Sequence, residues 1–270
     1  MERQFHVTDR LGYHHSDGCT SYKFMRLKVT VAYNGANFVG WQRQSKGRTV
    51  QKTIEDIISV ILNQPAEITS SGRTDSKVSA LGQVFHFDSD LNIQPSQWQK
   101  ALNAQLPEDI YIKNVCEVSD EFHARFNVIS KRYDYCIQTG NYDVLSYPFV
   151  FQLNRALDLE KMRECAALFI GEHDFTSFNA TPLEMIPYQI RTIKRLDIID
   201  EGERVRLIFE GKGFLRYMVR MITQVLIEVG LNRLAKDDVI LMFEENNKEA
   251  CKLNAPPQGL TLVEVRYNDR

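Results

Sequence analysis

The chain has 270 residues, which is long enough for one large domain or for two joined halves that share a sizeable core. Its composition, with 43% hydrophobic and 25% charged residues, is that of an ordinary soluble globular protein, and no run of about 20 apolar residues could span a bilayer. The formal net charge of −2 gives no global sign of a nucleic-acid partner, although a local cationic groove would be enough to bind one.

The five cysteines are scattered along the chain, and no two of them have Cys-x-x-Cys spacing. This pattern is typical of reduced thiols, so we expect a cytoplasmic protein without disulfides or a zinc site. Residues 1–23 lack the uninterrupted apolar core of a secretory signal, and we interpret them as a flexible polar extension. His14 and His15 lie in this extension and are expected to be solvated.

The first half of the chain predicts the element order β-α-β-β-α-β. Its elements are a strand at 24–33, a helix at 49–64, strands at 66–71 and 83–88, a helix from residue 96 and a strand at 110–118. Thr49 is a candidate N-cap of the first helix, and Ser96 with Gln99 forms a capping-box pattern at the start of the second.

The second half repeats this order without a repeat of residues. Its elements are a strand at 131–139, a helix at 158–171, strands at 190–200 and 203–211, a long helix at 214–230, an inserted helix at about 236–246 and a last strand at 260–267. The sequence therefore predicts an α+β fold of two ferredoxin-like halves, 24–125 and 126–270. We expect antiparallel or mixed sheets side by side, helices packed on one face, and a central cleft of the kind where ligands usually bind.

A short polar segment, GRTDSK, separates the two middle strands of the first half, and its Gly72 would let the backbone turn tightly. One interpretation is a turn in which the side chains of Thr74 and Asp75 bond their own backbone. The other is that Asp75 carries out chemistry at the edge of the cleft.

The long helix of the second half carries Arg216 and Arg220, four residues apart and away from its main apolar stripe. Either both guanidinium groups are solvated, or they meet an internal carboxylate or an anionic ligand, because an unpaired buried charge is unfavourable.

Tyr133 and Tyr135 share one face of the strand at 131–139. Tyrosines with this spacing are typical of a half-buried sheet, but an aromatic ring at a cleft can also stack on a base.

Basic residues gather at 43–52, 191–195 and 212–220, which fits either a solvated surface or a groove that follows phosphates. The chain has no P-loop, dinucleotide fingerprint, HExxH motif or nucleophile elbow. An enzyme built from these residues is expected to use Asp, Arg and Tyr, without a metal or a cofactor.

Seven blocks, taken together and in order, resemble the tRNA pseudouridine synthase A family, the anticodon-loop enzymes among the pseudouridine synthases. They are YNGANFVGWQRQ, GRTDSKVSALGQV, LPEDI, FHARFNVISKRYDY, GEHDFTSF, GFLRYMVRMI and APPQGL. The resemblance runs from about residue 24 to 268. It implies an isomerase that converts uridine to pseudouridine on the 3′ side of the tRNA anticodon stem-loop, without a cofactor, usually as a homodimer that holds tRNA across both subunits.

The resemblance also implies residue roles. Asp75 would be the nucleophilic carboxylate and Arg220 its partner, while Tyr133 would lie against the target uracil and help remove the C5 proton. Arg73 would hold the target out of the helix stack, and Leu260 would pack on the uracil.

Two positions depart from the family pattern, because Lys77 replaces the usual glycine and Ser79 the usual histidine. If the backbone there needs a positive φ, Lys77 is strained by about 1 to 3 kcal/mol or the loop bends differently. Lys77, like Arg216, is also a candidate contact for RNA phosphate. These departures motivate an alternative: a tRNA-binding or RNA-chaperone paralogue with little or no isomerase activity. A retained Asp75–Arg220 pair favours the enzyme.

Overall fold

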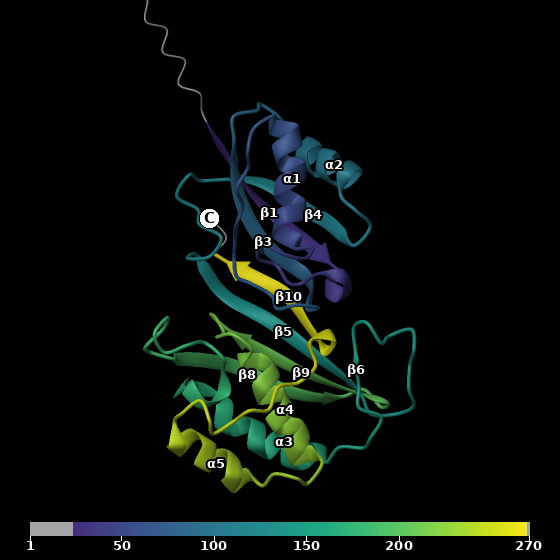
Figure 1. The fold of residues 1–270 in the computed structure, drawn as a ribbon, viewed down its shortest axis with the longest axis vertical. Coiled ribbons are helices and arrows are strands. Elements are labelled where there is room, and N and C mark those ends of the chain that lie inside the picture. Colours follow the sequence, from purple (N-terminus) through teal and green to yellow (C-terminus); the bar gives the residue numbers. More distant parts are fainter. Residues whose placement is uncertain (1–23, 269–270) are drawn as a thin grey trace, which may run out of the picture.

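A computed structural model describes residues 24–268 (Figure 1). The predicted extension at 1–23, with His14 and His15, lies outside the described residues. The described chain forms five α-helices and one ten-stranded sheet. Within this range, no helix is long and apolar enough to cross a membrane.

The first half contains the six predicted elements. They are β1 (Met25–Tyr33), α1 (Val50–Leu62), β2 (Thr69–Ser70), β3 (Ser79–Ser89), α2 (Pro95–Gln105) and β4 (Ile110–Val118). The N-cap prediction for α1 is confirmed, since the Lys52 N–H donates to Thr49 Oγ1 at 3.4 Å. The predicted capping box at Ser96 is wrong: α2 begins at Pro95, whose fixed φ suits a first helical position, and the Gln97 side chain accepts from the backbone N–H of Gln94.

The second half contains β5 (Val128–Gln138), β6 (Phe151–Gln152), α3 (Leu159–Ala166), β7 (Gly171–Asp174), β8 (Ile190–Asp200), β9 (Arg204–Gly211), α4 (Met218–Gly230), α5 (Lys236–Glu245) and β10 (Leu260–Tyr267). Two of these, β6 and β7, were not predicted because they are short. The long helix starts four residues later than expected, since Tyr217 has a left-handed backbone with φ of 62° and cannot continue a right-handed helix. Arg216 therefore lies before α4 and does not share a helical stripe with Arg220.

A single sheet joins the two halves, with the strand order β4-β1-β3-β10-β5-β9-β8-β7. The last strand makes the connection, because β10 pairs in parallel with β3 and antiparallel with β5. The boundary between residues 125 and 126 stays a prediction. The two sheets expected side by side are therefore one continuous sheet, in which β10 and β5 form the junction of the halves.

One face of this sheet is apolar from end to end. Directly opposed partners share a face, and the register places in one buried row Tyr33, Ala80, Leu262, Tyr133 and Phe209. Helical residues such as Ile54 of α1 and Ile222 of α4 belong to the same hydrophobic core. In Figure 1, α1 and α2 lie over the upper half, and α3 and α4 lie over the lower half. Strands β10 and β5 lie between these two helical layers (Figure 1).

Candidate active site

Asp75 lies in the loop that connects β2 to β3, and the first block of the family resemblance, YNGANFVGWQRQ, supports this loop. The Trp41 N–H donates to the Thr74 carbonyl at 3.1 Å, and the Lys77 N–H donates to the Phe38 carbonyl at 3.1 Å. The Tyr33 hydroxyl and Thr74 Oγ1 are 2.7 Å apart in a buried hydrogen bond. These bonds fix the backbone on both sides of Asp75, so its carboxylate is held in place before substrate binds.

Gly40 lies where this support meets the backbone of Thr74 and Asp75. Its φ is +118°, and a Cβ at this position would lie 3.0 Å from the Thr74 carbonyl oxygen. Only glycine adopts such a backbone without strain. The block therefore has a glycine at this point because two backbone segments must meet there.

Arg220 reaches Asp75 from the first turn of α4. Its Nη1 lies 3.5 Å from Asp75 Oδ2, although 145 positions separate the two residues in the chain. The Arg220 Nε donates to the Ala255 carbonyl at 2.7 Å, and the residue is 8% exposed. The pairing distance is well inside the range of about 4–6 Å within which charges perturb one another's pKa strongly.

Competing effects set the protonation of Asp75. Burial raises the pKa of its carboxyl group, while the charge and hydrogen bond of Arg220 and the more distant charge of Arg216 lower it. Burial outweighs the two arginines, and the pKa lies above its ordinary value. Without these cations a carboxylate in this position would be harder still to ionise.

Tyr133 stands on β5 above the centre of the sheet. It is 8% exposed, and its ring meets Phe214 edge-on at a centroid distance of 5.4 Å. Burial raises the pKa of the phenol well above its usual range, and the charges of Tyr33 and Asp75 raise it further. The hydroxyl is therefore neutral at physiological pH, and it enters any proton transfer as a phenol.

Tyr217, which the sequence analysis missed, links the two arginines. The guanidinium carbons of Arg216 and Arg220 lie 4.7 and 5.0 Å from the centre of its ring, and Arg216 Nη2 donates to its hydroxyl at 3.0 Å. Its left-handed backbone is of the kind that persists only where surrounding structure enforces it, often at functional sites. Nothing in the local pattern predicts a left-handed tyrosine, since it resembles any other helical residue.

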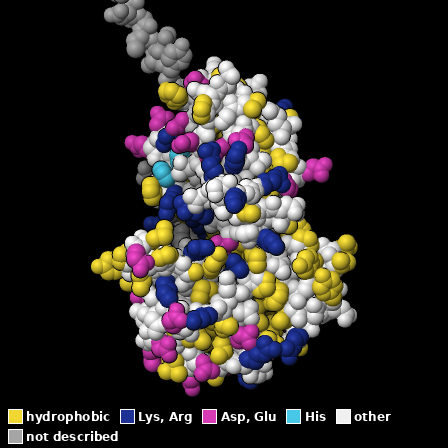
Figure 2. Space-filling model, in the orientation of Figure 1, with side chains coloured by type: hydrophobic (Ala, Val, Ile, Leu, Met, Phe, Trp, Pro, Cys, Tyr) yellow, Lys and Arg dark blue, Asp and Glu magenta, His cyan; other side chains and the backbone are white. Residues whose placement is uncertain are grey.

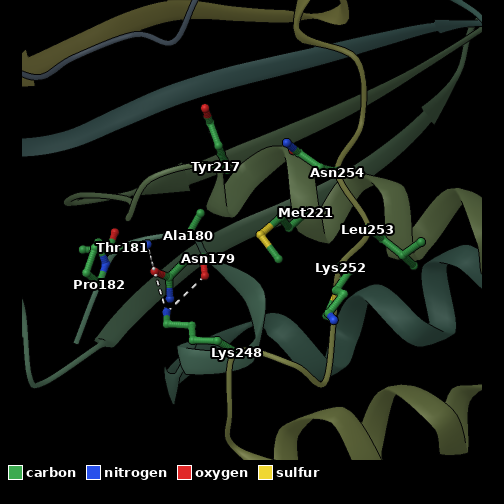
Figure 3. Close-up of a pocket in the computed structure, with 11 residues that line it drawn as sticks. Asn179, Ala180, Thr181, Pro182, Tyr217, Met221, Lys248, Lys252, Leu253 and Asn254 are labelled. Carbon is green, nitrogen blue, oxygen red and sulfur yellow. Dashed lines mark hydrogen bonds between the residues drawn. The ribbon is translucent and has the colours of Figure 1, made fainter.

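A pocket of about 410 Å³ opens beside Tyr217 and Met221 (Figure 3). Along one wall, the Lys248 ammonium points toward Asn179 and donates to its backbone and side-chain oxygens (Figure 3). Thr181, on the same wall, accepts the backbone N–H of Arg216 at 3.0 Å. The segment that follows the GEHDFTSF block, residues 179–181, thus anchors the backbone of Arg216.

The remaining predicted site residues flank this centre. Arg73 and Lys77 are exposed on the Asp75 loop, and Lys77 has the anticipated positive φ, 65°. Leu260 is 5% exposed and pairs with Tyr135 across the sheet. This pair lies two residues along β10 from the pair of Leu262 and Tyr133. Ser79 accepts the backbone N–H of Gly35 at 3.0 Å, so it joins the loop to its supporting block.

Lys131 is a second residue that the sequence analysis did not single out for the site. Its Nζ donates to the Ser71 carbonyl at 2.7 Å, at the start of the Asp75 loop. Burial, with a smaller effect of Arg125, lowers the pKa of this ammonium to about 8. Gly72, expected to allow a tight turn, does not have a positive φ. A Cβ there would lie 2.6 Å from Lys131 Nζ, so this glycine provides space for the ammonium.

The basic cluster at 43–52 is largely neutralised. Its ion pairs join Arg43 to Glu55, Arg48 to Asp109 and Lys52 to Asp56. In Figure 2, Lys and Arg side chains nevertheless gather across the middle of the molecule, around a hollow between the two halves. The positive charge is thus local, as a chain of nearly zero net charge requires if it is to bind RNA.

The comparisons with known proteins agree on one family. A sequence model described as tRNA pseudouridine synthase matches residues 29–127 and 165–268. A protein of Staphylococcus aureus named tRNA pseudouridine synthase A is 41% identical over 246 residues, 91% of this chain and 93% of the relative. A protein of Bacillus licheniformis with the same name is 39% identical over 248 residues, 91% of this chain and 100% of the relative.

Among solved structures, one chain of a Cbf5-Nop10-Gar1 complex aligns with a TM-score of 0.30 and 15% identity, covering 74% of this chain and 54% of its own. This likeness is too low to support an argument, and this chain spans only about half of that one. The two sequence comparisons, each over most of the chain, are sufficient. The protein belongs to the tRNA pseudouridine synthase A family.

Proposed function

We propose that this protein isomerises uridine to pseudouridine in tRNA, at the site formed by Asp75, Arg220 and Tyr133. Family membership supports the reaction and the tRNA substrate, and it disfavours the binding-only paralogue. The observation that carries the placement of the site is the Asp75 carboxylate 3.5 Å from the Arg220 guanidinium, in a loop held on both sides. The proposed targets are uridines on the 3′ side of the anticodon stem-loop.

The reaction breaks the N-glycosidic bond, turns the uracil and joins its C5 to the sugar; the C5 proton leaves and N1 is protonated. The ionised Asp75 acts either as a nucleophile toward sugar or uracil or as the base that takes a sugar proton. The charge and hydrogen bond of Arg220 lower the pKa of this carboxyl group and so oppose, in part, the larger effect of burial. Tyr133 lies beside the target ring and assists the loss of the C5 proton.

The target must leave its stack to reach this site, which costs about a few kcal/mol. Tyr133 and Leu260 provide apolar surface for the flipped uracil, and Arg73, exposed beside Asp75, occupies the space that the base leaves. Arg216 and Lys77 contact phosphates of the same strand. These roles are proposals from the family pattern and from the positions of the side chains around the Asp75 loop.

We further propose a cytoplasmic homodimer. The loop before β6 exposes five large hydrophobic residues: Tyr142, Val144, Leu145, Tyr147 and Phe149. Figure 2 shows hydrophobic side chains at the right of the lower half, where Figure 1 places this loop. A concentration of this kind is unusual on a monomer and is typical of an interface. A second copy of the chain is its proposed partner, as the family resemblance implies.

The decisive experiment measures pseudouridine formation on unmodified tRNA, with the modified sites mapped, for the parent protein and for Asp75→Asn. We expect product with the parent and none with the variant, while tRNA binding is retained. Asp56→Asn, which neutralises an exposed carboxylate on α1, is the matched control and should stay active. A parent that is folded and binds tRNA but forms no product would instead support the binding paralogue.

A further inference from the structure

The segment between β4 and β5 presents an aromatic pair to solvent. The side chain of Phe126 is 71% exposed, and its ring is stacked on that of His123 with centroids 4.2 Å apart and planes 27° apart. A phenyl ring this exposed adds little to the hydrophobic core, because its apolar surface stays in water. The pair is therefore available to a ligand.

Hydrogen bonds fix the pair in its exposed position. His123 Nδ1 accepts the backbone N–H groups of Arg125 and Phe126, at 3.1 and 3.3 Å. The Ala124 N–H donates to His86 Nδ1 at 3.1 Å, and the Tyr267 hydroxyl donates to the Ala124 carbonyl at 2.6 Å. A ligand that stacks on this ring meets a conformation that is already ordered, so little conformational entropy is lost on binding.

The pair also lies at one end of the strand that carries Tyr133. Phe126 precedes β5 by two residues, and the rise of about 3.3 Å per residue separates Val128 from Tyr133 by about 17 Å. Between them, on the face of Tyr133, Lys131 binds the carbonyl of Ser71 at the start of the Asp75 loop. The positive charge of Arg125 lowers the pKa of the Lys131 ammonium, which itself binds the start of this loop.

We propose that the stacked rings of Phe126 and His123 form a platform for an unpaired base of the tRNA substrate, a few nucleotides from the target uridine. Arg125 stands between His123 and Phe126 in the chain, and its side chain is exposed. In this proposal it contacts the phosphate next to the stacked base. Aromatic faces with neighbouring cations suit single-stranded RNA, because every base has a π-face and every nucleotide a charge. The inference rests on the proposed position of the active site at Asp75.

The first test replaces Phe126 with a fluorescent ring. In Phe126→Trp, titration with unmodified tRNA should quench the added indole, since stacking on a base brings the two π-systems into contact. Trp41 and Trp98 are 1% and 0% exposed, so their emission provides a constant background. Tyr111→Trp, at a 58% exposed position on the outermost strand β4, is the matched control and should show no quenching.

The second test removes the π-face and keeps the apolar side chain. Phe126→Leu should raise KM for tRNA by about fivefold to a hundredfold, with kcat within about twofold. Phe126→Tyr, which keeps the aromatic ring, should have the KM of the parent protein. Tyr111→Leu should change neither KM nor kcat. Unquenched emission from Phe126→Trp together with an unchanged KM for Phe126→Leu would overturn the platform.

Two other outcomes are distinguishable. If Phe126→Leu changes the oligomeric state measured by sedimentation, the rings belong to a protein contact, and the RNA platform is wrong. If Asp75→Asn remains active while tRNA still quenches the emission of Phe126→Trp, the proposed active site fails and the base-stacking surface stands.

Discussion

Asp75 illustrates how single residues balance opposing effects at this site. Burial disfavours its charged form, and the guanidinium of Arg220 opposes burial. Arg220 is itself buried, so each charge depends on the other and on the Ala255 carbonyl. The pair is therefore expected to control the pH range of activity as well as its rate.

The first prediction concerns pH. Arg220→Gln removes the strongest of the effects that lower the pKa of Asp75, so the acidic limb of the kcat/KM profile should move to higher pH and kcat should fall. Arg216→Gln removes a weaker charge effect and should move the limb less in the same direction. Arg155→Gln, an exposed arginine before α3, should leave the limb in place. If the acidic limb does not move in Arg220→Gln, Asp75 is not the group whose ionisation sets that limb.

The second prediction concerns Lys77, which has a left-handed backbone where the family usually has glycine. In Lys77→Gly, relief of strain is offset by the greater freedom of the unfolded chain, so the free energy of unfolding should change by less than about 1 kcal/mol. If Lys77 contacts a phosphate, the slope of log Kd for tRNA against log salt concentration should fall by the amount that corresponds to about one phosphate contact. Lys100→Gln, an exposed lysine of α2, is the charge control. An unchanged slope in Lys77→Gly would reject the phosphate contact.

At the scale of elements, α4 and the Asp75 loop show why local patterns predict strands and helices better than their ends. The apolar period of α4 continues through Phe214 and Leu215, yet the helix begins at Met218 because Tyr217 is left-handed. The loop has no periodic pattern, and its shape depends on hydrogen bonds to Phe38 and Trp41. Elements of regular period were predictable, whereas these junctions depend on contacts distant in sequence.

The third prediction tests the support of the loop. Gly40→Ala places a Cβ 3.0 Å from the Thr74 carbonyl, so the Asp75 loop must shift, and activity should fall at least about tenfold while the protein stays folded. Gly202→Ala has a similar backbone strain at φ +81° but no atom within 4 Å of the new Cβ. Comparing activity and melting temperature of the two variants separates displacement of the loop from strain alone. Equal activities would show that the contact with Thr74 does not matter.

At the scale of the whole molecule, β10 makes the two halves one body. It is the last strand in the chain, yet it lies in the middle of the sheet between β3 and β5. The proposed active site includes the Asp75 loop from one half and α4 from the other. The site therefore exists only when both halves are folded and joined.

The fourth prediction concerns assembly. Leu145→Asp, at a position 87% exposed in the loop before β6, should reduce the sedimenting species from dimer to monomer, because a charge would be desolvated in the proposed interface. Val60→Asp, at a position 70% exposed on α1, is the control and should leave the dimer intact. If both variants sediment as the parent does, this loop is not the subunit contact.

The sequence by itself determined the order of the main elements and the family, because periodicity and block order are local properties of the chain, and it supplied the residues proposed for the site. The tertiary structure confirmed the pairing of Arg220 with Asp75 that the resemblance implied, and it gave the geometry of that contact across 145 positions. It alone decided that Lys131 holds the start of the loop and that β10 joins the halves. These contacts arise from the register of one continuous sheet and from backbone conformations such as that of Tyr217. Their geometry depends on how distant segments pack, and no local pattern of residue types specifies it.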